Sequence, residues 1–263
     1  MQLIDIGVNL TNRSLFKQLG DIIKNAKQAG IIHQVITGTS LETSQQALQI
    51  IHSNPDYFSS TAGCHPHDAK HFKASDVQLL FQLAEQKGVV AIGECGLDFN
   101  RNYSPPEVQE KVFADQIEIA TKVKLPLFMH QRDAHRRFIE ILSQYKAHDI
   151  GGVVHCFTGD KQQLKDYLDL GLHIGITGWI CDERRGIELQ QAVKYLPLDR
   201  IMLETDAPYL LPRNIKPKPK SHTNVPANLP WIVMQLAEII GIDVVTVAAQ
   251  TTKNTKRFFS LST

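Results

Sequence analysis

The chain of 263 residues is 43% hydrophobic and 21% charged, with a formal net charge of +1. This apolar fraction excludes a disordered chain, and the near-neutral charge excludes a polybasic nucleic-acid binder, so any anion-binding surface must be local. The four cysteines form no Cys-x-x-Cys pair and are too few for a disulfide framework. Because there is neither a signal peptide nor a run of about 18 apolar residues, we expect a soluble cytoplasmic protein with no membrane partner, and a monomer by default.

Short β-branched runs alternate with longer stretches of helical period along the whole chain. Leu15, Ile22 and Ala26, for example, fall on one face of a helix predicted over 14–29. Strands are predicted over residues 3–8, 31–38, 59–63, 89–93, 125–129, 152–155, 172–176 and 201–204. The other predicted helices cover 41–53, 75–87, 105–123, 133–145, 160–170, 186–196, 225–240 and 243–258.

Eight strands with intervening helices predict an α/β fold of the (β/α)8 TIM-barrel type, as one domain over residues 1–263. The main alternative, a doubly wound open sheet, usually carries a glycine-rich first turn, which the stretch 8–11 lacks. The Pro- and Lys-rich stretch 212–221 leaves too few residues after it for a typical second domain. We therefore interpret it as a long loop after the eighth strand.

Metal-ligand residue types recur where the predicted strands end. Glu94, His130 and His155 each end or directly follow an apolar run, Asp206 comes shortly after another, and His65 follows the third strand. A single strand-end histidine or glutamate is more often structural, but five in one chain favour a site, because parallel strand ends converge on one barrel face. Such a set suits Mg²⁺, Mn²⁺ or Zn²⁺.

These positions lie in five strings: Thr61-Ala62-Gly63-Cys64-His65-Pro66-His67, Ala91-Ile92-Gly93-Glu94-Cys95-Gly96-Leu97-Asp98, Met129-His130, His155-Cys156-Phe157-Thr158-Gly159 and Leu203-Glu204-Thr205-Asp206-Ala207-Pro208-Tyr209. In order and spacing, from about residue 3 to 258, the strings closely resemble the TatD family of metal-dependent deoxyribonucleases. The resemblance implies a barrel hydrolase that removes nucleotides from the 3′ end of single-stranded DNA and RNA, using Mg²⁺ in the cytoplasm. It also implies that Glu94, His130 and His155 bind metal, that Asp206 is a ligand or acid/base, and that His65 lies close by.

The start of the chain departs from the family pattern. Many members open with Asp-x-His-x-His, whereas here Gly7 and Asn9 replace the two histidines after Asp5. Glycine has no ligating side chain and neutral asparagine is a weak ligand. We therefore expect one of two metal positions to be weak or water-rich. Whether the site holds one metal ion or two is left open. The loss of nitrogen ligands favours Mg²⁺ over Zn²⁺. Asp5 either orients a ligand or is a structural acid.

Phosphodiester hydrolysis needs an in-line water, relief of phosphate charge and protonation of the leaving oxygen. Asp206 is placed to hold or deprotonate that water, and Glu204 shares its face if the strand stays extended. Alternatively, Glu204 is the buried partner of a cation. His65 is expected to bind the phosphate or to protonate the leaving group.

Basic residues follow several of the predicted strands and fit an anionic polymer, although charge runs are usually only solvated surface. Arg213, Lys216, Lys218 and Lys220 occupy the loop after the eighth strand, and Arg132 follows the fifth. We predict that five residues bind the substrate: His67, Arg132, Arg213, Lys216 and Lys218.

Three functions are compatible with these patterns. The preferred one is a 3′–5′ exonuclease acting in DNA repair or nucleic-acid turnover. A related barrel hydrolase that cleaves an amide or an aminoacyl-tRNA ester is the second, because fold and metal do not fix the bond cleaved. The third, a non-catalytic component associated with protein export, is disfavoured because a scaffold has no need for the His, Glu and Asp residues.

Overall fold

The computed structural model describes residues 1–145 and 149–261. In this part of the chain the strands belong to one eight-stranded sheet, in the order β1 to β8. The pairings β1–β2, β3–β4, β4–β5, β5–β6 and β7–β8 are all parallel. The strands are β1 (Leu3–Val8), β2 (Ile31–Ile36), β3 (Phe58–Ala62), β4 (Val89–Asp98), β5 (Leu127–Arg132), β6 (Gly152–Val154), β7 (His173–Ile176) and β8 (Ile201–Leu203).

Helices separate successive strands, which is the alternation of a (β/α)8 barrel, and the predicted fold class is therefore confirmed. The α-helices are α1 (Arg13–Phe16), α2 (Leu19–Gln28), α3 (Leu41–Ser53), α4 (Ala74–Ala84), α5 (Pro106–Val123), α6 (His135–Gln144), α7 (Lys161–Asp169), α8 (Ile187–Ala192), α9 (Leu229–Ile240) and α10 (Val244–Phe258). The 3-10 helices are η1 (Pro66–His71), η3 (Gly178–Cys181), η4 (Val193–Tyr195), η5 (Leu198–Arg200) and η6 (Pro226–Asn228).

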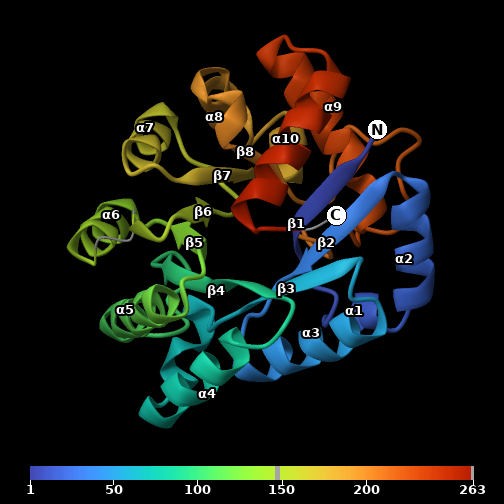
Figure 1. The fold of residues 1–263 in the computed structure, drawn as a ribbon. Helices are drawn as coiled ribbons and strands as arrows, with labels where there is room; N and C mark the ends of the chain where they lie inside the picture. Colours follow the sequence, from blue (N-terminus) through green and yellow to red (C-terminus); the bar gives the residue numbers. More distant parts are fainter. Residues whose placement is uncertain (146–148, 262–263) are drawn as a thin grey trace. The chain divides into compact units, whose positions relative to one another are not determined.

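The chain divides into two compact units. The first comprises Met1–Ile36, Cys156–Lys165 and Ile174–Thr263, and the second comprises Thr37–His155 and Asp166–His173. In the first unit α10 packs against β1, β8 and α9, as Figure 1 shows. Val8 at the end of β1 forms a parallel bridge with Ala207, just after β8.

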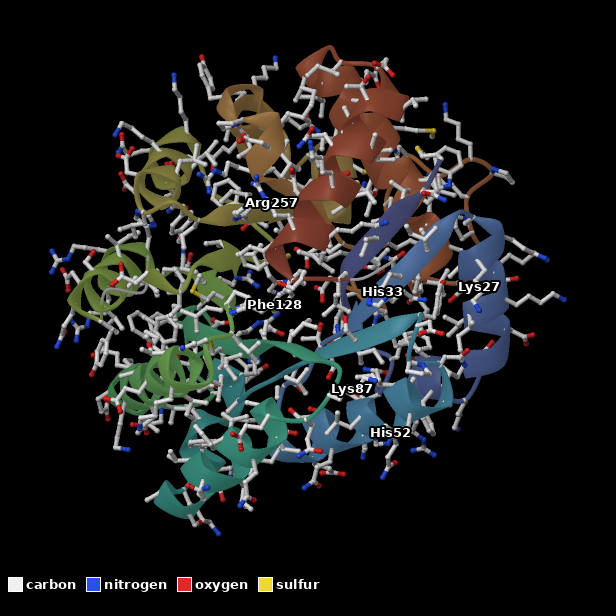
Figure 2. All side chains as sticks on the ribbon, in the orientation of Figure 1. Lys27, His33, His52, Lys87, Phe128 and Arg257 are labelled. Atoms are coloured by element: carbon white, nitrogen blue, oxygen red, sulfur yellow. The ribbon has the colours of Figure 1, made fainter. Side chains whose placement is uncertain are left out.

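The second unit is built on the parallel strands β3 to β6. Helix α3 packs on β3, while α4 and α5 pack on β4 and on each other (Figure 1). Its core is aromatic: Phe113 and Phe138 are fully buried, with stacked rings whose centroids lie 5.2 Å apart. Phe128 on β5 is also fully buried, whereas His52 on α3 is exposed (Figure 2). This core supports the strand ends that carry the site described below.

The predicted elements are correct in order but not in every boundary. The single helix predicted over 14–29 is wrong, because Gln18 adopts φ −124° and separates α1 from α2. The strands predicted over 89–93 and 125–129 end too early, since residues 95–98 continue to pair with residues 129–132. Glu94 and His130 therefore lie inside β4 and β5 rather than just after them.

Among the described residues, no single helix has the length and apolar character needed to cross a membrane. One pair, Pro226–Ile240 with Val244–Phe258, passes that test of length and composition only when its two members are taken together, and it is bent by 112°.

Candidate metal centre

His65 is fixed by backbone contacts at the start of η1. Its own N–H donates to the carbonyl of Thr39 at 2.9 Å, and its Nδ1 accepts the backbone N–H of His67 at 3.1 Å. Because Nδ1 is an acceptor, the neutral ring carries its proton on Nε2. His65 therefore presents an N–H donor toward the site.

Glu94 is aimed by an irregularity in β4. The register between β4 and β5 shifts between Ile92 and Cys95, so one extra residue interrupts the regular alternation of side chains at Glu94. Gly93 adopts φ +149°, and a Cβ there would lie 2.0 Å from the carbonyl oxygen of Phe128. Only glycine permits this approach of β4 to β5.

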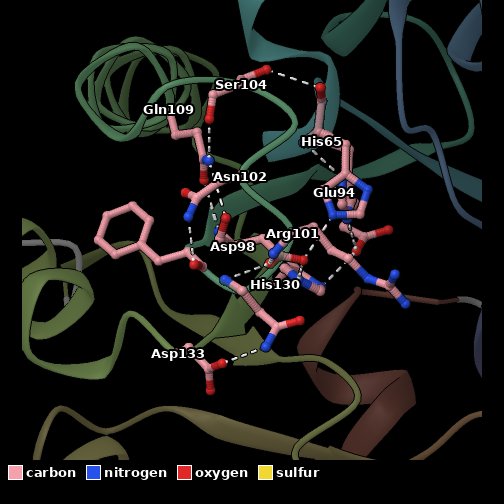
Figure 3. Close-up of polar contacts among 12 residues, drawn as sticks. His65, Glu94, Asp98, Arg101, Asn102, Ser104, Gln109, His130 and Asp133 are labelled. Carbon is pink, nitrogen blue, oxygen red and sulfur yellow. Dashed lines mark hydrogen bonds and ion pairs between the residues drawn. The ribbon is translucent and has the colours of Figure 1, made fainter.

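Three imidazoles converge on one carboxylate oxygen. Oε1 of Glu94 lies 3.1 Å from Nε2 of His65, 3.3 Å from Nδ1 of His130 and 3.2 Å from Nε2 of His155. Figure 3 shows His65, Glu94 and His130 facing one another. The side chain of His155 is 3% exposed and that of His130 is 20% exposed, so the cluster opens to solvent at His130. We call His65, Glu94, His130 and His155 the histidine–glutamate cluster.

Asp98 extends the cluster outward along β4. Its Oδ2 lies 3.2 Å from Nε2 of His130 and 2.7 Å from Nε2 of His67. With its Nε2 engaged by a carboxylate, His130 turns Nδ1 toward Glu94. A carboxylate behind a histidine is the usual way in which a metal-binding imidazole is oriented. Sequence reasoning gave Asp98 no role, although it lies within one of the strings that identify the family resemblance.

The pKa values in the cluster are set by two opposing effects, burial and the contacts between the imidazoles and the carboxylates. Burial alone would raise the pKa of Glu94, but His65, His155 and His130 together hold this pKa well below its ordinary value. Burial lowers the pKa of His65 despite its contact with Glu94. Burial also acts to lower the pKa of His130, but its hydrogen bonds to Asp98 and Glu94 raise that pKa overall. Glu94 is thus an ionised carboxylate in a buried setting.

The donors of the cluster fit a divalent cation. Oε1 of Glu94 lies 3.3 Å from Nδ1 of His130 and 3.2 Å from Nε2 of His155, separations that one ion with bonds of about 2.0–2.2 Å can span. Carboxylate oxygen and imidazole nitrogen are ligand types shared by Mn²⁺ and Zn²⁺, and Mg²⁺ needs only one or two carboxylates with water. A cation would also compensate the buried charge of Glu94, as the histidine protons do here.

Asp206 and Asn9 meet in the first unit. Nδ2 of Asn9 donates to Oδ1 of Asp206 at 3.1 Å and to the carbonyl of Ala207 at 3.2 Å. Asp206 itself has φ +52°, a conformation uncommon for a non-glycine residue and costly to hold. Asn9, at a position where the family resemblance leads us to expect a histidine, therefore orients the carboxylate of Asp206.

Asp5 and Glu204 are both completely buried in the first unit. Asp5 accepts the backbone N–H of Thr205 at 2.9 Å and its hydroxyl at 2.5 Å, so it fixes the residue between Glu204 and Asp206. Glu204 accepts the backbone N–H of Cys156 at 2.5 Å. The stretch from Glu204 to Asp206 does not continue as a regular strand, because Asp206 has φ +52°, outside the extended region.

The predicted substrate-binding residues have different surroundings. His67 is held by Asp98 beside the histidine–glutamate cluster, and Arg132 is exposed at the end of β5. Arg213 donates through Nε and Nη2 to Glu183 at 2.9 and 2.6 Å, so it is already ion-paired. Lys216 and Lys218 are exposed, with no carboxylate partner in the part of the chain that the structure describes. Their roles remain predictions.

A (β/α)8 fold whose strand ends gather three histidines and a glutamate defines a metal-dependent hydrolase of the TIM-barrel class. A family model described as TatD related DNase matches residues 4–260, and the chain belongs to this family. A protein of Pectobacterium parmentieri named 3′–5′ ssDNA/RNA exonuclease TatD is 48% identical over 260 residues, which cover 99% of this chain and 100% of that protein.

A protein of the same name from Erwinia amylovora is 50% identical over 259 residues, covering 98% of this chain and 100% of its own length. Among solved structures, a TatD family hydrolase of Entamoeba histolytica matches with a TM-score of 0.90, 26% identity and 98% coverage of both chains. These similarities extend over nearly the whole chain and agree with the family resemblance of the sequence strings.

Asp5 generates a prediction about pH and stability. Burial raises its pKa to about 7 from an ordinary 3.8, so the folded protein keeps a proton that the unfolded chain has released. The free energy of unfolding should therefore fall between about pH 4 and pH 7, by up to roughly 1.4 kcal/mol per pH unit. Asp5→Asn removes this dependence, and urea unfolding at pH 5 and pH 8 measures it.

Asp182→Asn is the matched control. Asp182 is also buried in the first unit, but backbone N–H donors of Arg184 and Arg185 outweigh burial and lower its pKa to about 2, so it does not titrate between pH 5 and pH 8. The same loss of stability with pH in Asp5→Asn and in the wild-type protein would refute the prediction.

Proposed function

We propose that this chain is a metal-dependent 3′–5′ exonuclease that hydrolyses phosphodiester bonds of single-stranded DNA and RNA. The observation that supports it is the convergence of three imidazoles on Glu94 in a chain whose full-length relatives carry that activity in their names. The names favour phosphodiester over amide or aminoacyl ester bonds. Action in the cytoplasm as a monomer, in DNA repair or nucleic-acid turnover, belongs to the same proposal.

Glu94, His130 and His155 are the proposed ligands, and Mg²⁺ is the proposed ion. When bound, a divalent ion would relieve charge on the phosphate and lower the pKa of a bound water. With its Nε2 proton held by Asp98, a neutral His130 would offer the Nδ1 that now faces Glu94 to the ion. The role of Asp206 as ligand or as base for the attacking water stays a prediction, as does that of Glu204.

His65 is proposed as a hydrogen-bond donor to the scissile phosphate or the leaving oxygen rather than as a ligand. Its Nδ1 is occupied by the backbone N–H of His67, and its Nε2 carries the proton that faces Glu94. A protonated nitrogen cannot bind a metal, but it can donate to an oxyanion. General acid assistance of this kind contributes about 10²–10⁴-fold to rate.

The first prediction of this proposal concerns the ligands. Glu94→Ala should lower Mg²⁺-dependent hydrolysis of a 3′-labelled oligonucleotide by more than about 100-fold and should weaken Mn²⁺ binding in calorimetry. Asp98→Asn should cost about 10–100-fold in metal affinity, because it acts through His130. Glu118→Ala, at an exposed position of α5, is the control and should change neither measurement. Full activity of folded Glu94→Ala would exclude the assignment.

The second concerns the missing histidines. Gly7→His with Asn9→His should tighten Zn²⁺ or Mn²⁺ binding, because two imidazole nitrogens replace a residue without a side-chain ligand and a weak amide. Gly7→His alone separates the effect of a new ligand from loss of the hydrogen bond between Asn9 and Asp206. Calorimetry that finds the wild-type stoichiometry and affinity in both variants would count against the prediction.

The third concerns the lysines of the loop after β8. If they contact phosphates, replacing Lys216, Lys218 and Lys220 by Gln should flatten the log–log salt dependence of single-strand binding by up to roughly 2 units. KM should rise more than kcat falls, since these contacts lie away from the scissile bond. Arg213→Gln should change the slope less, because Arg213 is already paired with Glu183. An unchanged slope in the triple variant would identify the loop as solvated surface only.

A further inference from the structure

An exposed tyrosine contacts His67, whose ring in turn contacts the histidine–glutamate cluster. Tyr103 is 54% exposed, and its ring meets that of His67 edge-on, with centroids 4.8 Å apart and planes at 72°. His67 in turn stacks edge-on against His65 at 4.2 Å and shares Oδ2 of Asp98 with His130. The ring of His67 thus lies between the rings of His65 and Tyr103, and the Tyr103 side chain is exposed to solvent.

The segment that carries Tyr103 is held rigidly at both ends (Figure 3). Before the tyrosine, Oδ1 of Asp98 accepts the backbone N–H groups of Asn100 and Arg101 at 3.1 and 2.8 Å, and Asn102 donates to the carbonyl of Phe99 at 2.7 Å. After it, the Ser104 hydroxyl donates to the carbonyl of His67 at 2.9 Å and accepts the N–H of Lys70 at 3.0 Å.

Gln109 on α5 holds both ends of the segment between Asp98 and Ser104. Its Nε2 donates to the carbonyl of Ser104 at 2.7 Å and to that of Asp98 at 3.1 Å, while its Oε1 accepts the N–H of Asp98 at 2.8 Å. The ends of the segment are therefore tied to each other through one buried side chain. A ring presented on such a scaffold loses little conformational freedom when it binds a ligand.

Arg101 supplies a positive charge two residues from Tyr103. Its backbone is bound to Asp98, but its side chain is exposed. Within residues 1–145 and 149–261 its guanidinium forms no ion pair. A guanidinium without an ion pair and an exposed phenol ring, carried two residues apart on one segment, match the two features of a single-stranded nucleotide: a phosphate and a base face.

We propose that Tyr103 stacks on a base near the 3′ end of the substrate and that Arg101 contacts the phosphate of the same part of the strand. This rests on the proposed exonuclease function and assigns the residues that hold the strand. Stacking accepts every base, because each has a π-face, so it allows stepwise removal without sequence preference. In a duplex each inner base already stacks on both faces, so the ring can stack on such a base only after the strand end has been unpaired.

The test is a binding cycle without turnover, with oligonucleotides carrying a single abasic position at each of the four sites nearest the 3′ end. In EDTA, removal of one particular base should weaken wild-type binding by about 5- to 100-fold. Tyr103→Ala should weaken binding of the intact strand by a similar factor and lose that discrimination. Tyr103→Phe keeps the ring and should retain both.

Tyr195→Ala is the matched control, since Tyr195 is 60% exposed but its ring faces Lys161 rather than a histidine. It should leave binding unchanged. Arg101→Gln should flatten the log–log salt slope by about 0.7 and keep the abasic discrimination, because it removes one phosphate contact and no stacking partner. Circular dichroism and Mn²⁺ affinity of each variant establish that the fold and the cluster are intact.

The outcomes separate the two proposals. A wild-type protein that neither binds nor hydrolyses single strands would overturn the exonuclease function itself. A wild-type protein that hydrolyses them, with the abasic discrimination preserved in Tyr103→Ala, would overturn the stacking role alone. An Arg101→Gln slope equal to the wild-type slope would overturn the phosphate contact.

Discussion

The buried charge of Glu94 is the constraint on which the second unit depends. An isolated carboxylate removed from water costs far more than a fold of this size can lose, so it requires compensation by protons or by a cation. Three imidazoles provide that compensation at a single oxygen. Each comes from a separate stretch of chain, which means that His65, His130 and His155 can be placed together only when β3 to β6 are paired in register.

Two buried glutamines of α5 maintain that arrangement where strand pairing alone does not. Gln116 binds both the N–H and the carbonyl of Cys64, at 2.8 and 3.0 Å, and so sets the backbone just before His65. Gln109 binds the N–H and the carbonyl of Asp98 in the same way. The two glutamines are seven residues apart and lie on the buried face of α5. Helix α5 therefore fixes the distance between Cys64, which precedes His65, and Asp98 at the end of β4.

The sequence predicts the strand order and the positions of Glu94, His130 and His155, because each lies where a short apolar run gives way to polar residues. It does not predict the contact of Asp98 with His130, since that contact requires β4 to continue beyond Gly93 and to carry an irregularity that alternation of side chains does not report. The exposure of Tyr103 is likewise unpredictable, because it depends on side-chain hydrogen bonds within a loop rather than on periodicity.

Asn9 stands where the family resemblance leads us to expect a histidine, and its side chain forms hydrogen bonds of a different kind. An imidazole offers one basic lone pair, whereas a primary amide offers two donors and a weak acceptor. Both contacts of the Asn9 amide are donations, one to Asp206 and one to the backbone of Ala207. In this chain the amide at position 9 therefore holds a carboxylate, and it does so at a residue, Asp206, whose φ of +52° is costly to adopt. The hydrogen bond from Asn9 helps to offset the cost of the backbone conformation at Asp206. It also fixes the direction of the Asp206 carboxylate.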